Sequence, residues 1–108
     1  MRDGLYKVHF RTPRGEGAGV VVLQSGRVLG GDAAMYYVGT YSEDGDRFTA
    51  DIHARMHTKG PGFGSVFGVD DVVIHLSGLT TGDTGQLLGE SPQAPGITFQ
   101  AMFSLLDD

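Results

Sequence analysis

The chain has 108 residues, no cysteine and a formal net charge of -5, and 40% of its residues are hydrophobic. This length gives one globular domain that buries a core without cross-links, and the missing cysteines exclude disulfides, a thiolate nucleophile and cysteine-containing metal sites. Because the eight basic residues are scattered along an acidic chain, we expect no binding to nucleic acid.

The beginning of the chain has neither the pattern of a signal peptide nor that of a membrane span. Residues 1–4 lead directly into an alternating segment, and no run approaches the roughly 18 apolar residues that a span requires. The absence of cysteine suits a reducing compartment. These features predict a cytoplasmic protein without a membrane partner.

Short runs of period two follow one another along the chain, separated by breaks rich in glycine and proline. Such runs predict strands with one inward and one outward face. The clearest run has Phe48, Ala50 and Ile52 on one face and polar residues on the other. The predicted strands cover residues 4–12, 17–24, 27–29, 36–41, 48–57, 72–77, 82–89 and 97–105.

Four connections between these strands have signals of their own. Ser25 and Gly26 form a two-residue hairpin turn. Asp32 is expected to accept hydrogen bonds from backbone amides at the start of a single helical turn through residues 33–35. Residues 42–46 form an acidic hairpin turn, and residues 59–68 form a long irregular loop that contains four glycines and one proline.

About eight strands with short connections predict an all-β fold, a small eight-stranded antiparallel up-and-down barrel that occupies residues 1–108 as a single domain. Eight strands enclose room for packed side chains or for one small ligand. The barrel therefore has two candidate functional surfaces, which are its interior and the tips of its turns.

Several motifs in the first half of the chain occur in a characteristic order. They are Asp3-Gly4-Leu5-Tyr6, Gly17, Gly19, Gly30-Gly31-Asp32, Tyr37, Gly39 and Ser42-Glu43-Asp44. In this order and spacing, over roughly residues 3–56, the chain resembles the GrlR family, the small lipocalin-like negative regulators of type III secretion in enteric bacteria. The second half matches mainly in the rhythm of its strands.

The resemblance implies a lipocalin-like barrel, a homodimer, and binding to a transcriptional activator through a surface run that reads Glu-Asp-Glu-Asp in the family. In this chain the run is Glu43-Asp44-Gly45-Asp46. Gly45 replaces the third acid, which suits a tight turn and removes one charge from the implied partner surface. The residues expected to bind a regulatory protein are therefore Glu43, Asp44 and Asp46.

The same three carboxylates have a physical interpretation that needs no family. Together they create a negative potential that attracts and orients a basic protein surface. A solvated hairpin turn explains the same residues without any partner, because Asp-Gly turns with flanking acids are ordinary turn chemistry. Both interpretations stay open at this point.

The alternative function is an intracellular carrier of a small hydrophobic ligand in the barrel interior. Alternation assigns an aromatic set to the inward faces, and Tyr37, Tyr41, Phe48 and Phe99 are the residues expected to line a ligand site. Simple core packing explains the same aromatic residues, since eight-stranded barrels are often filled completely by side chains.

A protease interpretation of Asp83-Thr84-Gly85 is weaker than a hairpin turn. The triplet resembles that of the aspartic proteases, whose dimers join two such carboxylates. However, the retroviral-type enzymes carry it near the first quarter of the chain, whereas here little chain remains after Gly85. We expect no catalytic residues and no enzymatic activity.

Three histidines and an aspartate on outward faces raise the question of a metal site. His53 and His57 are four residues apart on a strand, a separation of ~13 Å, so they do not share a metal ion. Pairing either with Asp51 and His75 depends on a register between strands that the sequence leaves open. We expect solvated histidines, no metal and no cofactor.

Overall fold

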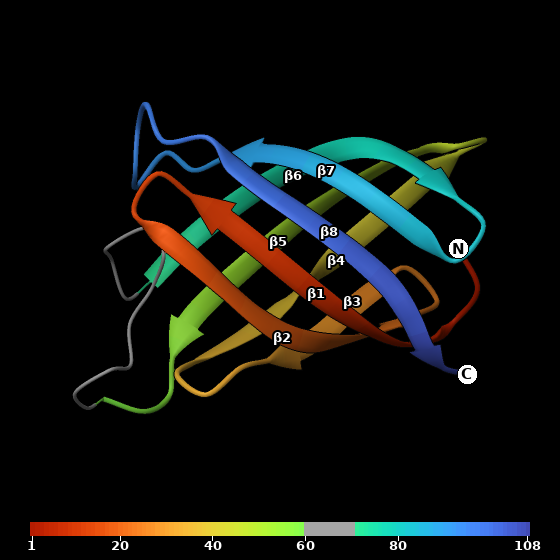
Figure 1. Ribbon diagram of the computed structural model, residues 1–108, viewed down its shortest axis with the longest axis horizontal. Coiled ribbons are helices and arrows are strands. Elements are labelled where there is room, and N and C mark those ends of the chain that lie inside the picture. The colour runs from red at the N-terminus through yellow and green to blue at the C-terminus, as the bar shows by residue number, and fades with distance from the viewer. Residues whose placement is uncertain (60–70) are drawn as a thin grey trace.

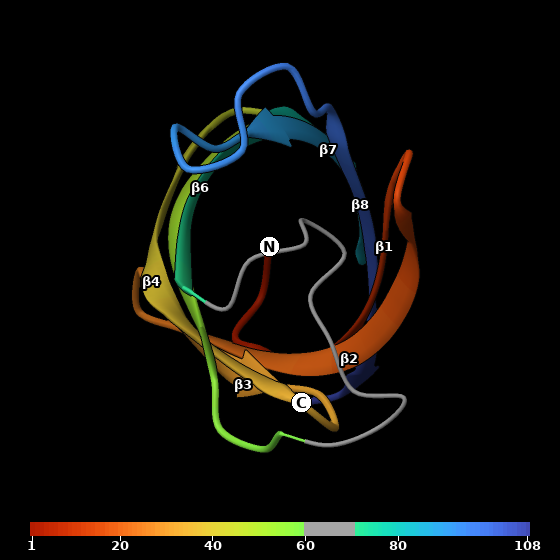
Figure 2. The same cartoon turned by 90° about the vertical axis from the view of Figure 1, so that its left-hand side faces the viewer.

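The computed structural model describes residues 1–59 and 71–108, which form a closed barrel of eight antiparallel strands in which sequence neighbours pair and the first strand also pairs with the last (Figures 1 and 2). The predicted all-β, up-and-down barrel is confirmed. The predicted loop at residues 59–68 lies, from Gly60 onward, outside the described residues. The strands are β1 (Gly4–Thr12), β2 (Gly15–Gln24), β3 (Arg27–Gly31), β4 (Met35–Asp44), β5 (Arg47–Met56), β6 (Asp71–Thr81), β7 (Thr84–Glu90) and β8 (Phe99–Asp107).

The alternation of apolar and polar residues determines which face of each strand points inward. In β5, the side chains of Phe48, Ala50, Ile52 and Ala54 are buried, and the residues between them are exposed or half-buried. The predicted turn at Ser25-Gly26 is also confirmed. Ser25 and Gly26 have φ angles of 51° and 84°, the left-handed backbone that tight hairpins with the twist of β-strands require.

The helical turn predicted after Asp32 is wrong. The backbone N–H of Asp32 donates to the carbonyl of Met35 at 2.9 Å, which closes a tight turn between two antiparallel strands instead of starting a helix. The expected role of Asp32 as an acceptor is confirmed, because its Oδ1 accepts from the amides of Ala34 at 2.9 Å and Met35 at 2.8 Å. The next strand begins at once, at Met35.

Several strand boundaries also differ from the prediction, and two of these differences lie at two-residue turns. Strand β4 extends through Asp44, so only Gly45 and Asp46 form the acidic turn. Strand β7 begins at Thr84 instead of Gly82, because Gly82 has a φ of 61° and forms the turn together with Asp83.

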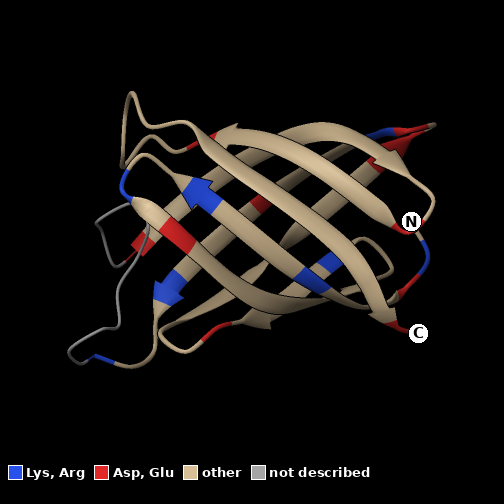
Figure 3. Cartoon of the chain, viewed as in Figure 1, with Lys and Arg blue, Asp and Glu red and all other residues tan. Residues whose placement is uncertain are grey.

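The two ends of the barrel differ in the connections that they carry and in charge (Figures 1 and 3). At one end, here called the terminus end, lie both chain termini and the turns β2–β3, β4–β5 and β6–β7 (Figure 1). The opposite end, the loop end, carries the connections β1–β2, β3–β4 and β7–β8. Acidic residues gather at the terminus end (Figure 3). They are Asp3, Glu43, Asp44, Asp46, Asp83, Asp107 and Asp108.

Inside the barrel, large aromatic side chains stand opposite glycines on the neighbouring strand. This pairing of large and small residues lets an eight-stranded barrel hold aromatic rings in its narrow interior. The cross-strand pairs are Phe10 with Gly17, Tyr37 with Gly30, Phe48 with Gly78, Phe99 with Gly89, and Phe103 with Gly85.

Candidate functional site

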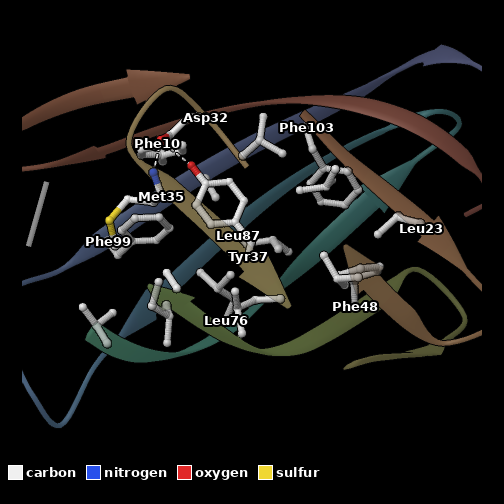
Figure 4. Close-up of a pocket in the computed structure, with 18 residues that line it drawn as sticks. Phe10, Leu23, Asp32, Met35, Tyr37, Phe48, Leu76, Leu87, Phe99 and Phe103 are labelled. Carbon is white, nitrogen blue, oxygen red and sulfur yellow. Dashed lines mark hydrogen bonds between the residues drawn. The ribbon is translucent and has the colours of Figure 1, made fainter. Parts of the chain in front are cut away.

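The barrel interior holds a cavity of about 100 Å³ (Figure 4). Eighteen of the described residues line it, from the strands and from the β3–β4 turn, and sixteen of these are apolar. The two exceptions are Asp32 and Tyr37. The cavity is therefore an apolar site with a single polar spot.

An aromatic group closes the interior toward the terminus end. Phe48 is its centre, since its ring lies 5.2 Å from the ring of Tyr41 in a stacked arrangement and 5.2 Å from that of Phe103. Tyr6 meets Phe103 edge to face at 5.8 Å, and its hydroxyl donates to the carbonyl of Arg2 at 2.6 Å. These contacts leave Phe48 only 2% exposed.

A second aromatic group lies toward the loop end. Phe10 stacks on Phe99 with ring centres 5.8 Å apart and meets Tyr37 edge to face at 6.1 Å. Such offset and edge-to-face pairs stabilise the core beyond the area that they bury. The cavity extends between the two groups, because Phe48 and Phe103 line it from one side and Phe10, Tyr37 and Phe99 from the other.

The polar spot is a hydrogen-bonded pair. The Tyr37 hydroxyl donates to Oδ2 of Asp32 in a short hydrogen bond, while Oδ1 accepts from the two turn amides (Figure 4). Burial, and then the hydrogen bond to Asp32, raises the pKa of the Tyr37 phenol above its usual value. The phenol therefore stays neutral and keeps its proton between the two oxygens.

This raised pKa predicts a loss of stability in alkali. Above pH 10, the usual tyrosine pKa, the unfolded chain releases the Tyr37 proton and the folded chain retains it. The contribution of this group to the free energy of unfolding should therefore be constant below about pH 10 and fall above it, by up to about 1.4 kcal/mol per pH unit. Urea unfolding of the wild type and Tyr37→Phe from pH 8 to 11 measures the effect.

Burial also raises the pKa values of Tyr6 and Tyr41. The free energy of unfolding therefore still falls with pH in both proteins. The prediction therefore concerns the difference between the two slopes. Identical slopes for the wild type and Tyr37→Phe would contradict it.

Of the four residues predicted to line a ligand site, three line the cavity and one does not. Tyr37, Phe48 and Phe99 face it, whereas Tyr41 lies behind Phe48. Asp32 also lines the cavity, a position that the sequence does not reveal because this residue belongs to a turn and not to an alternating strand. Its only sequence signal is that of an acceptor for turn amides.

The three carboxylates predicted to bind a partner lie together at the tip of β4 and β5 but differ in their contacts. Both carboxylate oxygens of Glu43 accept from the N-terminal ammonium of Met1 at 2.6 Å, and the Glu43 side chain is only 24% exposed. Asp44 and Asp46 are exposed. The main-chain carbonyl of Asp46 accepts from the amide of Thr80 at 2.8 Å, which fixes the tip against β6.

The outward histidines of β5 and β6 form separate pairs with aspartates. His53 Nε2 lies 2.5 Å from Asp71 Oδ1, and His75 Nδ1 lies 2.5 Å from Asp51 Oδ1. The hydrogen bond from His53 lowers the pKa of Asp71. Within the described part of the chain, no three histidine or acidic side chains come together in a way that could hold a metal ion.

The Asp83-Thr84-Gly85 triplet lies at the β6–β7 turn. The Asp83 carboxylate receives two hydrogen bonds at 3.1 Å from the guanidinium of Arg2, which also donates to Asp108 at 2.7 Å. The Arg2 guanidinium therefore joins the β6–β7 turn to the last residue of the chain.

No model of a known protein family matches this chain, and no curated protein matches it either. The resemblance to the GrlR family therefore stays a prediction. In residues 1–59 and 71–108 there is no helix of the length and apolar character that crossing a membrane demands.

Proposed function

We propose that this protein binds a small, mainly apolar molecule inside its barrel. The observation that carries the proposal is the cavity of about 100 Å³, in which sixteen of the eighteen described lining residues are apolar. Apolar cavities of this general size stay dry and accept small apolar molecules such as benzene. Binding of this kind makes the protein a carrier or sensor for the ligand.

The wall of the cavity favours a compact ligand. Aromatic rings line it toward both ends and its volume is only about 100 Å³, so a long acyl chain does not fit without displacing Phe48 or Phe10. A small ring or a short branched chain fills the volume and contacts aromatic and aliphatic walls together. The affinity of such a ligand is limited by its few atoms, at most about 1.5 kcal/mol for each non-hydrogen atom.

A thermal unfolding experiment with toluene tests the proposal. A ligand that binds only the folded chain raises the unfolding midpoint by an amount that grows with the ratio of its free concentration to its Kd. We expect toluene to raise the midpoint of the wild type, and Ala101→Leu, which places a larger side chain in the cavity wall, to abolish the shift. The matched control is Ala18→Leu, which changes an exposed alanine on the outer face of β2.

Two results would contradict the proposal. One is the absence of any midpoint shift in the wild type at saturating toluene. The other is an equal shift in Ala101→Leu and Ala18→Leu, which would indicate binding at the outer surface.

A second candidate function is regulation of a partner protein through the acidic tip. It is favoured by the exposure of Asp44 and Asp46 at the tip of β4 and β5, which a backbone hydrogen bond holds against β6 at the acidic terminus end. A fixed negative surface of this kind selects a basic partner and speeds its association. The partner implied by the family resemblance is a transcriptional activator.

Charge reversal distinguishes this function from a solvated turn. We expect the wild type to capture a basic partner and added salt to weaken this binding. The variant Asp44→Lys/Asp46→Lys should no longer bind the partner. Glu43 is left intact because it binds the N-terminal ammonium. The control Glu16→Lys/Glu90→Lys changes the net charge equally at exposed sites outside the tip, so equal loss in both variants would reject a specific role for the tip.

The homodimer implied by the resemblance also stays a prediction. Exposed apolar side chains on the outer faces of neighbouring strands offer surfaces for it, one on β2 to β4 and another on β6 to β8. The residues are Val20, Val22, Leu29 and Tyr36 in the first set and Leu79, Leu88, Met102 and Leu106 in the second.

A further inference from the structure

We propose that the Asp32–Tyr37 pair makes the cavity selective for small apolar molecules that carry one hydrogen-bond donor, such as a hydroxyl or amino group, and against molecules that carry a carboxylate. This inference rests on the proposed function, since it names the ligand class of the same cavity. Among the described residues that line the cavity, these two alone have polar side chains.

The pair offers acceptors to the cavity and no free donor. The single hydroxyl proton of Tyr37 lies in the hydrogen bond to Oδ2 of Asp32. The Tyr37 oxygen therefore retains lone-pair capacity for a donor from the ligand. The Asp32 carboxylate has no proton to give, and its Oδ1 already accepts from the amides of Ala34 and Met35.

A ligand donor would extend an existing chain of hydrogen bonds. The ligand N–H or O–H donates to the Tyr37 oxygen, whose own proton goes to the Asp32 carboxylate. Each bond in such a chain polarises the next, and the chain ends on an ionised acceptor, where hydrogen bonds are strongest. The turn amides of Ala34 and Met35 hold that acceptor in place.

The charge of the site excludes acids. Asp32 carries the only formal charge among the described residues that line the cavity, and no lysine, arginine or histidine is among them. A carboxylate entering the cavity would lose its hydration next to a like charge and find neither a counterion nor a free donor. An ammonium or hydroxyl group instead finds an acceptor in the Tyr37 oxygen, and an ammonium also finds an opposite charge in Asp32.

Titration calorimetry with toluene, phenol and benzoate tests the inference. These three probes share one ring and differ in the polar group that they bring to the pair. Phenol loses more hydration than toluene on entering an apolar site, so a cavity without a polar acceptor favours toluene. In the wild type we expect phenol to bind at least about tenfold more tightly than benzoate.

The double variant Asp32→Asn/Tyr37→Phe isolates the pair. Asparagine keeps a side-chain oxygen for the turn amides, and phenylalanine keeps the ring that packs on Phe10. We expect the preference for phenol relative to toluene to fall about tenfold or more in this variant. Tyr41→Phe removes a tyrosine hydroxyl outside the cavity and should leave the preference unchanged.

The outcomes separate this inference from the proposed function. If toluene binds and the relative affinity of phenol is the same in the wild type and the double variant, the cavity binds apolar molecules but the pair does not select them. If the wild type binds benzoate as tightly as phenol, this result by itself overturns the inference. If neither toluene nor phenol binds, both the proposed function and the inference are rejected.

Discussion

Replacing Gly78 by alanine should remove about 3 kcal/mol or more from the free energy of unfolding. A Cβ atom at this position would lie 2.9 Å from both the carbonyl carbon of Gln86 and the Cα of Leu87, and closer still to the Gln86 carbonyl oxygen. All three atoms belong to the backbone of β7, so relief requires that a whole strand moves. Urea unfolding of Gly78→Ala measures the loss.

Gly45→Asn is the matched control for Gly78→Ala. Gly45 has a φ of 63° in the acidic turn and open space around the position of a Cβ, and asparagine tolerates this backbone, so we expect a loss within about 1 kcal/mol. If both variants lose the same free energy of unfolding, the close approach of the β7 backbone would not be the reason that position 78 requires glycine.

A different response is expected at Gly85, where the obstacle is a side chain. An added Cβ would collide with the ring of Phe103. Phe103→Leu removes part of this ring, so the losses of Gly85→Ala and Phe103→Leu should be less than additive, by about 1 kcal/mol or more. The losses of Gly78→Ala and Phe103→Leu should instead add, since the obstacle at Gly78 is the backbone.

The second large effect is expected for Phe48→Ala, with a loss of about 3 to 5 kcal/mol. Phe48 is 2% exposed and its ring packs on those of Tyr41 and Phe103, so truncation leaves a void between two aromatic side chains. This loss is a large part of the roughly 5–15 kcal/mol that stabilises a typical domain. Equilibrium urea unfolding provides the measurement.

The matched control for Phe48→Ala is Leu88→Ala, because Leu88 is 58% exposed on the outer face of β7. Its truncation should change the stability by no more than about 0.5 kcal/mol. The void left by Phe48→Ala also joins the cavity, so toluene should stabilise this variant more than it stabilises the wild type. A loss below about 1 kcal/mol would mean that the terminus-end aromatic group does not pack as described.

The barrel was predictable because its residues alternate with few exceptions. In β5 the inward positions hold Phe48, Ala50, Ile52 and Ala54, and period two is sufficient to assign such a strand and its faces. The turn at Ser25-Gly26 was predictable for a similarly local reason. Both depend on neighbours in sequence and not on the packing of distant segments.

The features that were missed depend on pairing between strands. The helical turn after Asp32 was the wrong interpretation of a sound local signal, since the same aspartate serves a turn whose geometry is set by the pairing of β3 with β4. The lining role of Asp32 and the place of Tyr41 behind Phe48 follow from barrel closure. The contact between Glu43 and the N-terminal ammonium joins residues 42 positions apart and has no local sequence signal.

The pairing of β1 with β8 also sets a condition on how the chain folds. Leu5 lies opposite Asp107, so the final seam of the barrel joins segments from the two extremes of the chain. The loop entropy of this seam is the largest in the molecule, and chains dominated by such distant pairings fold slowly. Until the seam forms, β1 and β8 each present an unpaired edge to other molecules, so protein concentration during refolding should decide between barrel and aggregate.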